Sequence, residues 1–258
     1  MVHLICYNIE YCEGLKGRWY EYLNFIKEFF LPPKKLDEQM ISALKKLKPD
    51  ILGLVEVDLG SRRSHHRDEA EFFKNGLKMK SFDEAVKYDN KGIGKFFMKT
   101  LPIMRKQAIA LISRYKITDV KHHVLHRGVK RVLIEATVHT PKKVTILLAH
   151  LALGKKARKK QITEIIDIVN LIKNPVILMG DFNTFKGDSE IEELLQKTHL
   201  EHKAKIGKKT FDFTQPTFKP HRLLDYVLTS PQIKVKQYEA LKMPFSDHLP
   251  LYVEFDVL

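Results

Sequence analysis

A carboxylate and an amide directly follow a short apolar run in the segment NPVILMGDFNTF, residues 174–185. The run 175–179 is typical of a buried strand, and Asp181 and Asn183 come where the chain leaves it. Two interpretations stand at this point. Asp and Asn are common turn residues because their side chains bond nearby backbone groups. Alternatively, a rigid strand holds both side chains at a reacting centre, where they would serve proton transfer or phosphate binding.

The same pattern recurs along the chain, where several apolar runs end in a side chain that could bind a metal ion or a phosphate. Taken singly, most of these residues fit a turn, an ion pair or a hydrogen-bonded core position. Glu56 is the exception, because an ionised carboxylate inside an apolar run is costly unless a cation compensates it. Repetition at six places favours one shared site. The residues are Asn8, Glu56, His150, Asp181, Asn183, Asp225, Asp247 and His248.

Length and composition predict a single domain spanning residues 1–258. A hydrophobic fraction of 44% and a charged fraction of 29% are typical of a soluble globular chain. No apolar run reaches the roughly 18–20 residues that span a bilayer, and the N-terminal segment has no signal-peptide pattern. We therefore expect a cytoplasmic monomer. Cys6 and Cys12 lack metal-ligand spacing, so we expect packed thiols rather than a disulfide.

The chain carries a large positive charge. It has 45 Lys and Arg residues against 31 Asp and Glu residues, a formal net charge of +14. Such an excess favours a polyanionic partner, which could be nucleic acid, an anionic lipid or a phosphorylated small molecule. The alternative is that the lysines chiefly confer solubility. Charge alone therefore supports a phosphate-rich substrate without naming it.

Hydrophobic periodicity predicts alternating helices and strands. Two sets of strands separated by helices predict two sheets packed face to face with helices outside, an α/β/β/α sandwich. Helices are expected at 18–30, 36–48 and 155–173, with a further helix after the charged segment 60–73. Strands are expected at 2–8, 49–57, 106–113, 116–125, 130–139, 142–153, 223–230, 233–241 and 249–258.

Seven segments in order resemble the endonuclease/exonuclease/phosphatase superfamily of deoxyribonuclease I-like, metal-dependent phosphoesterases. They include YNIEYCEG, PDILGLVEVD, ILMGDFNTF, LLDYVLTS and SDHLPLYVEF, and together they extend from residue 7 to residue 255. The combination of GDFN with SDH is specific. The resemblance implies a four-layered α/β/β/α sandwich with two mainly antiparallel or mixed sheets. It also implies hydrolysis of phosphoester bonds by water that attacks phosphorus.

The resemblance implies a divalent cofactor, Mg²⁺ or alternatively Mn²⁺. Glu56 would be its principal ligand, since a hard cation prefers carboxylate oxygen. Asn8 would help to order the metal and the phosphate, and Asp247 would complete the set directly or through water. Glu10 occupies a position that is acidic in some relatives.

The resemblance also implies catalytic roles. Asp181 would orient and deprotonate the attacking water, with Asn183 beside it. His248 would contact a nonbridging phosphate oxygen, and Asp225 would keep that imidazole oriented and cationic. His150 would touch the phosphate or protonate the leaving oxygen.

Basic residues near these segments are candidates for binding the substrate. Arg131 or its neighbour Lys130 could reach the phosphate, and Arg158 matches a family feature. The loop SRRSHHRD, residues 61–68, could grip flanking phosphates or simply be a solvated loop. Three histidines in HHVLH could suggest a transition-metal site, but the absence of matching ligands favours surface histidines.

The positive net charge favours DNA or RNA as the substrate, so nucleic acid is the expected partner. Lipid head groups or small phosphorylated molecules are the alternative substrates, and an inactive nucleic-acid-binding module is the alternative from another class. Relatives specialised for abasic DNA usually have Trp at the position before Asn8 and Tyr at the position of His150. This chain has Tyr7 and His150 there, which argues against an abasic-site role.

Overall fold

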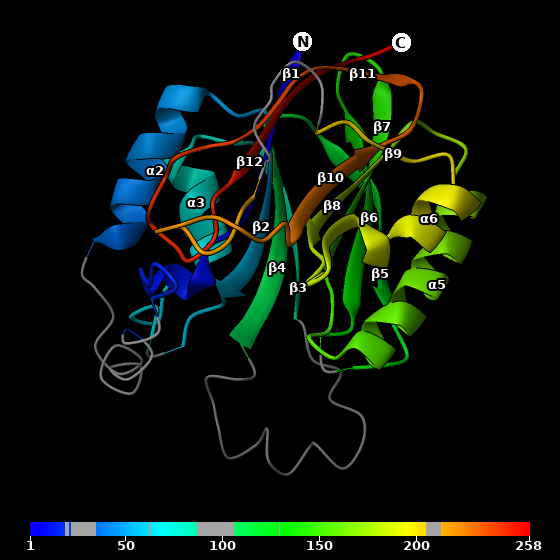
Figure 1. Ribbon diagram of the computed structural model, residues 1–258. Coiled ribbons are helices and arrows are strands. Elements are labelled where there is room, and N and C mark those ends of the chain that lie inside the picture. Colours follow the sequence, from blue (N-terminus) through cyan, green and yellow to red (C-terminus); the bar gives the residue numbers. More distant parts are fainter. Residues whose placement is uncertain (19–20, 22–34, 62, 87–105, 129, 205–212) are drawn as a thin grey trace.

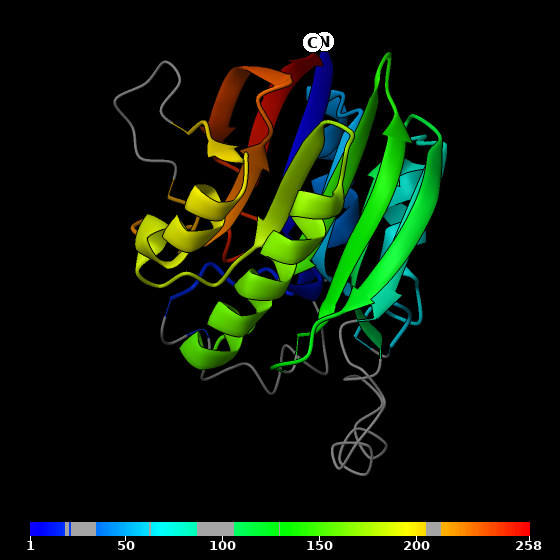
Figure 2. The same cartoon turned by 90° about the vertical axis from the view of Figure 1, so that its right-hand side faces the viewer.

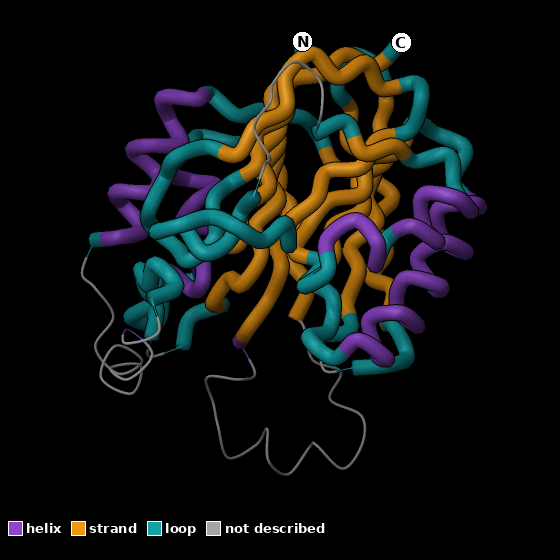
Figure 3. The backbone as a smooth tube through the Cα atoms, in the orientation of Figure 1, coloured by secondary structure: helices purple, strands orange, loops and turns teal. Residues whose placement is uncertain are grey.

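Two six-stranded sheets pack face to face in the computed structural model, with helices on both outer surfaces (Figures 1 and 3). The structure describes residues 1–258 except 19–20, 22–34, 62, 87–105, 129 and 205–212. The four layers confirm the α/β/β/α sandwich expected from the sequence. The helix expected at 18–30 lies mostly outside the described residues.

The first sheet has the strand order β11-β12-β1-β2-β4-β3. Its central strands β1 and β2 run parallel, and its other neighbours are antiparallel, so the sheet is mixed. Its strands are β1 (Val2–Asn8), β2 (Ile51–Asp58), β3 (Ser81–Val86), β4 (Gln107–Ser113), β11 (Ile233–Ala240) and β12 (Leu251–Val257).

The second sheet has the order β5-β6-β7-β8-β10-β9 and repeats the same plan. Strands β7 and β8 form its parallel pair, and the other neighbours are antiparallel. Its strands are β5 (Ile117–Val124), β6 (Val132–His139), β7 (Lys143–His150), β8 (Val176–Asp181), β9 (Glu201–His202) and β10 (Asp225–Thr229).

Helices α2 and α3 cover the first sheet, and α5 and α6 cover the second (Figure 1). Helix α5 presents an apolar stripe at helical spacing, including Ile162, Ile165 and Val169, to the second sheet. Both chain termini lie at one end of the sandwich (Figure 2). The helices are α2 (Leu36–Leu47), α3 (Glu69–Gly76), α5 (Lys155–Leu171) and α6 (Glu192–Lys197), with short 3₁₀ turns η1 (Glu10–Cys12) and η4 (Gly187–Glu190).

Most elements expected from periodicity are confirmed, and three short ones were missed. Strand β3 has the sequence SFDEAV, and all but one of its residues are only partly buried, so it lacks a continuous apolar signal. Helix α6 has six residues and β9 has two, lengths too short for a periodic pattern to show.

The parallel pairs explain why polar residues at strand ends meet. The carboxyl ends of parallel neighbours emerge at one edge of a sheet, which places Asn8 beside the end of β2 and His150 beside Asp181. Antiparallel partners begin where these strands end: Asp225 opens β10 opposite Asp181. Residues far apart in the chain therefore gather at one end of the sandwich.

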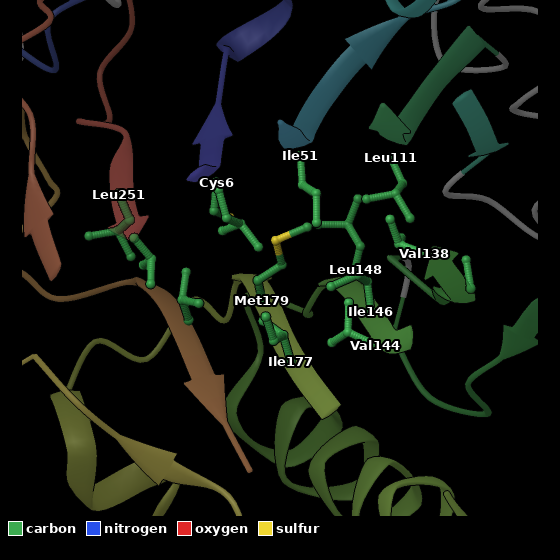
Figure 4. Close-up of a cluster of buried hydrophobic side chains, with 14 of the residues drawn as sticks. Cys6, Ile51, Leu111, Val138, Val144, Ile146, Leu148, Ile177, Met179 and Leu251 are labelled. Atoms are coloured by element: carbon green, nitrogen blue, oxygen red, sulfur yellow. The ribbon is translucent and has the colours of Figure 1, made fainter. Parts of the chain in front are cut away.

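An apolar core fills the space between the sheets (Figure 4). Met179 of β8 reaches across to β2, where Gly53 leaves room for it. A Cβ atom on Gly53 would lie 2.4 Å from the Met179 methyl carbon. The close approach of the two sheets holds β2 and β8 in fixed relation, and both strands deliver candidate site residues.

Replacing Gly180 with alanine should destabilise the fold strongly. Its backbone has φ of +140°, and an added Cβ would lie 1.8 Å from the carbonyl oxygen of Ala149. We expect the free energy of unfolding from urea denaturation to fall by about 3 kcal/mol or more. Gly154→Ala is the control, because a Cβ there meets no atom within 4 Å. Equal stability of the two variants would contradict this account.

Candidate active site

The eight polar residues identified at run ends come together at the carboxyl ends of the parallel strand pairs. The first sheet contributes Asn8 from β1 and Glu56 from β2, and the loop before β12 contributes Asp247 and His248. The second sheet contributes His150, Asp181, Asn183 and Asp225. Contacts between these groups, given below, cross from one sheet to the other. Their convergence supports the shared site that the sequence predicts.

A β-bulge explains how Glu56 leaves an apolar strand. The register of β2 on β4 shifts between Val55 and Val57, so Glu56 is the extra residue, and its φ is +59°. A bulge turns the side chain away from the alternating pattern of the strand. The Glu56 side chain is 17% exposed and its Oε1 lies 3.7 Å from Nε2 of His150 in the other sheet. The carboxylate thus faces the site instead of the core.

His248 and Asp225 form a buried ion pair. Nδ1 of His248 lies 2.6 Å from Oδ2 of Asp225, and the side chains are 5% and 1% exposed. Burial by itself disfavours the charged imidazole, but Asp225 and Asp247 outweigh it and raise the pKa of His248 well above its ordinary 6.5. His248 is therefore cationic at neutral pH, with its Nε2 edge 3.9 Å from Asp247.

Asp181 lies at the centre of the hydrogen-bond network. Its Oδ2 accepts from the side-chain amide of Asn8 at 3.0 Å, and its Oδ1 accepts from the backbone N–H of Asn183 at 2.9 Å. His150 Nε2 lies 3.4 Å from the same carboxylate. Burial raises the pKa of Asp181 to about 6, against the opposing effect of His248. A carboxylate with a pKa close to neutrality suits a general base.

Three carboxylates, those of Glu10, Glu56 and Asp247, crowd one side of the site. Burial, followed by the charges of Asp247, Glu13 and Glu56, raises the pKa of Glu10 well above its ordinary value. Burial also raises the pKa of Asp247, with Glu56 adding to the effect and His248 opposing it. Oε2 of Glu10 is buried and, within the described part of the chain, has no hydrogen-bond partner. These residues fit a hard divalent cation, which would compensate the surplus negative charge.

A tighter group, Asp181, Asp225 and His248, has one potential ligand atom from each residue within 4.8 Å of the others. It is a poor cation site for a chemical reason. His248 gives its Nδ1 to Asp225 and is protonated, and a protonated imidazole has no lone pair for a metal. The carboxylates around Glu56 are the better candidates.

Two further residues reach the site. The sequence predicted Lys130 only as an alternative to Arg131, and it did not predict Gln215. Lys130 Nζ contacts His150 Nε2 and lies 3.5 Å from Glu56 Oε1, whereas Arg131 donates through Nε to the carbonyl of Leu125 at 2.8 Å. Gln215 donates its amide to Asp247 Oδ2 at 3.1 Å. The loop that carries Gln215 has no periodic or motif signal, so only the fold reveals its role.

A model of the Endonuclease/Exonuclease/phosphatase family matches residues 8–248 of this sequence. The chain belongs to this family. Its members are hydrolytic phosphoesterases that generally depend on a divalent metal, so this endonuclease/exonuclease/phosphatase protein is a phosphoesterase. A comparison with curated proteins gave no match.

Solved structures of the endonuclease/exonuclease/phosphatase family share the fold at low sequence identity. A Beutenbergia cavernae family protein aligns with a TM-score of 0.76 at 16% identity, over 99% of this chain and 71% of that one. The mannosyl-6-phosphatase Bt3783 of Bacteroides thetaiotaomicron aligns at 0.69 and 17%, over 99% and 100%. The human Nocturnin catalytic domain, with a bound sulfate anion, aligns at 0.67 and 19%, over 100% and 94%.

Arg158 of this family member is engaged inside the protein instead of facing the site. Its guanidinium pairs with Glu190 at 2.5 Å and donates to the carbonyls of Ala152 and Leu153. The side chain is 3% exposed. Arg158 therefore fixes the segment that follows His150, which differs from the substrate contact expected from the sequence.

The histidines of HHVLH pair with acidic residues from three different elements, β3 of the first sheet, β6 of the second sheet and helix α5. His122 lies 2.6 Å from Asp83, His123 lies 2.6 Å from Glu135, and His126 lies 3.2 Å from Glu164. Each histidine has a different carboxylate, as expected for surface residues rather than a shared metal site.

No helix within the described residues has both the length and the apolar character needed to cross a membrane.

Asp225→Asn should lower the pKa of His248, because burial then acts with one less opposing charge. The folded wild type holds this proton more tightly than the unfolded chain. Its free energy of unfolding should therefore fall as the pH rises from about 6.5 through the raised pKa. The free energy of unfolding of the variant should depend less steeply on pH over this range. Imidazole NMR and urea denaturation against pH measure both effects, and an unchanged His248 pKa would contradict the ion pair.

Proposed function

We propose that the protein is a Mg²⁺-dependent phosphodiesterase that cleaves DNA or RNA by attack of water at phosphorus. The observation that carries this proposal is the division of charge within one buried site. Carboxylates of Glu10, Glu56 and Asp247 gather on one side, while the cationic His248 and Lys130 lie beside them. Such a site suits a divalent cation and a phosphate anion held together.

Glu56, Glu10 and Asp247 would hold the metal, with Asn8 beside them. When bound, a divalent ion supplies Lewis-acid stabilisation of the charge that builds on the phosphoryl oxygens and the leaving oxygen. The Asn8 side chain joins this group to Asp181, because its amide N–H donates to Asp181 and its Oδ1 accepts from the Glu10 backbone. Gln215 holds Asp247 from the other side.

Asp181 accepts a proton from the attacking water in this mechanism. Its pKa of about 6 leaves it mostly ionised at neutral pH, while keeping it basic enough to take the proton. Asn183 orients the water or the phosphate. Its backbone N–H binds Asp181 and its side-chain amide donates to the carbonyl of Leu151 at 2.9 Å, so the residue is fixed on both sides.

His248 and Lys130 supply positive charge to the phosphate. Asp225 holds the His248 imidazole in place and keeps it protonated. Because Lys130 has only donors, its contact with His150 requires the Nε2 lone pair of that ring to accept. We therefore assign the donor role near the leaving oxygen to the Lys130 ammonium, with His150 orienting it.

The surface near the site supports a polyanionic substrate. Lysines 155, 156, 159 and 160 are exposed on the first turns of α5, which starts close after His150. They lie at the positive end of the helix dipole, so both contributions attract phosphate.

Two exposed aromatic rings flank the site and support a nucleic acid in particular. Phe185 and Phe218 are each 48% exposed. Phe185 follows Asn183 by two residues, and the Arg222 guanidinium carbon lies 5.9 Å from its ring centroid. Phe218 adjoins Thr217, whose N–H binds the Asp247 carbonyl at 3.0 Å. Aromatic and arginine side chains of this kind stack on nucleobases.

Among the neighbouring structures, one is named a mannosyl-6-phosphatase and another holds a sulfate anion. A small phosphorylated molecule is therefore the alternative substrate that the tests must separate from nucleic acid. The cytoplasmic location, the monomeric state and the single domain stay predictions from the sequence.

Glu56→Gln should lower metal-dependent turnover by about 100-fold or more while the fold persists, because the principal anionic ligand is lost. The assay is a panel of single- and double-stranded DNA, RNA, a sugar phosphate and bis-nitrophenyl phosphate, each with Mg²⁺, Mn²⁺ or EDTA. Lys173→Gln, at an exposed position after α5, is the control. Cleavage of the sugar phosphate alone would favour the alternative substrate, and full activity in EDTA would overturn the proposal.

The double variant Phe185→Ala, Phe218→Ala should raise KM for an oligonucleotide about 10-fold, because base stacking is lost. Hydrolysis of methyl nitrophenyl phosphate should stay within about 2-fold of the wild type. Leu171→Ala is the control, since Leu171 is 82% exposed at the far end of α5. Equal losses on both substrates would argue against base stacking.

A further inference from the structure

The two segments that carry Glu10 and Glu56 have unusual backbones. Glu10, Tyr11 and Cys12 have φ of +47°, +52° and +55°, and Glu56 has φ of +59°. None of these residues is glycine, and a bulky side chain in the left-handed region costs free energy. Such conformations persist only where surrounding contacts hold them. The structure must therefore contain an interaction that fixes both segments.

Arg63 makes that interaction. Its NH1 donates to Glu13 Oε1 at 2.9 Å, and its NH2 and Nε donate to Asp58 Oδ2 at 3.0 and 3.2 Å. The guanidinium carbon lies 3.6 Å from the centroid of the Tyr11 ring. The side chains of Arg63, Glu13 and Asp58 are 2%, 2% and 0% exposed. One buried guanidinium thus joins the segment after β1 to the end of β2.

The two partners of Arg63 lie close in sequence to the candidate metal ligands Glu10 and Glu56. Glu13 follows Glu10 by three residues, and Asp58 follows Glu56 by two. Fixing Glu13 and Asp58 on one planar guanidinium therefore fixes the distance between the two strained carboxylate-bearing segments.

Asp58 is itself held from several directions, which makes the link rigid. Its Oδ1 accepts from the Ser61 backbone at 2.6 Å and from the Ser64 hydroxyl at 3.0 Å. Its own backbone N–H donates to Glu69 at 2.8 Å. The loop that follows β2 therefore wraps around Asp58 and Arg63. It turns this arginine inward, toward Glu13 and Asp58.

We propose that Arg63 is a positioning residue, which holds Glu10 and Glu56 at the separation that binds the divalent cation. This inference rests on the proposed function, because it assumes that these carboxylates take a metal. Only a planar guanidinium spans the two carboxylates while stacking on Tyr11, so lysine is a poor substitute although it keeps the charge. A merely structural role would lower stability and leave the metal affinity of the folded protein unchanged.

The experiment is isothermal titration of Mn²⁺ and Mg²⁺ into the full chain without substrate, for wild type, Arg63→Lys and Arg63→Met. We expect Arg63→Lys to weaken metal binding about 10-fold, and Arg63→Met to weaken it further. Arg67→Met is the matched control. Arg67 lies in the same loop, pairs with Asp37 at 2.5 Å and stacks on Phe72, and among the described residues it makes no ion pair with Glu13 or Asp58. The metal affinity of the Arg67→Met variant should stay within about 2-fold of the wild-type value.

Circular dichroism and the thermal midpoint in EDTA establish that each variant is folded. If Arg63→Met does not fold, Arg63→Lys and Glu13→Gln decide the question, because both retain a polar group at a buried position. A folded Arg63→Lys with wild-type metal affinity would overturn the inference. Metal binding by the wild type without phosphodiesterase activity would overturn the proposed function while leaving this role of Arg63 intact. A wild type that binds neither ion would overturn both.

Discussion

The structure depends on one electrostatic constraint, the burial of several carboxylates at the same end of a two-sheet core. Burial raises the pKa values of Glu10 and Asp247, the charge of Glu56 adds to both effects, and the charge of Asp247 adds to the effect on Glu10. Such a concentration of negative charge is unfavourable in a protein interior without a compensating cation. His248 and Lys130 supply part of that compensation, and a divalent metal would supply the rest. This division of charge suits the proposed function, in which a cation and a phosphate are held together.

The fold holds these charges against their mutual repulsion. Each sheet has a parallel pair at its centre, and side chains such as Met179 lock the sheets together. The groups at the site then have little freedom to move apart. Strain at Glu10 and Glu56 indicates that geometry here is maintained at some cost in stability, a common property of functional sites.

Much of the fold and of the residue set could be predicted from the sequence. Apolar runs marked the strands, and Glu56 stood out because a carboxylate inside such a run needs compensation. Contacts set by loop geometry could not be predicted. Sequence alone left Lys130 and Arg131 as alternatives, whereas in the structure Lys130 Nζ lies 3.5 Å from Glu56 Oε1 and Arg131 Nε donates to the Leu125 carbonyl. Arg63 looked like part of a basic loop for phosphates, but its partners lie 50 and 5 residues away in the chain.

The most direct test is an anomalous difference map from crystals grown with Mn²⁺. The account predicts one strong peak in contact with the Glu56 carboxylate, with Glu10 and Asp247 around it directly or through water. A peak between Asp181, Asp225 and His248, or no peak in this end of the sandwich, would contradict it.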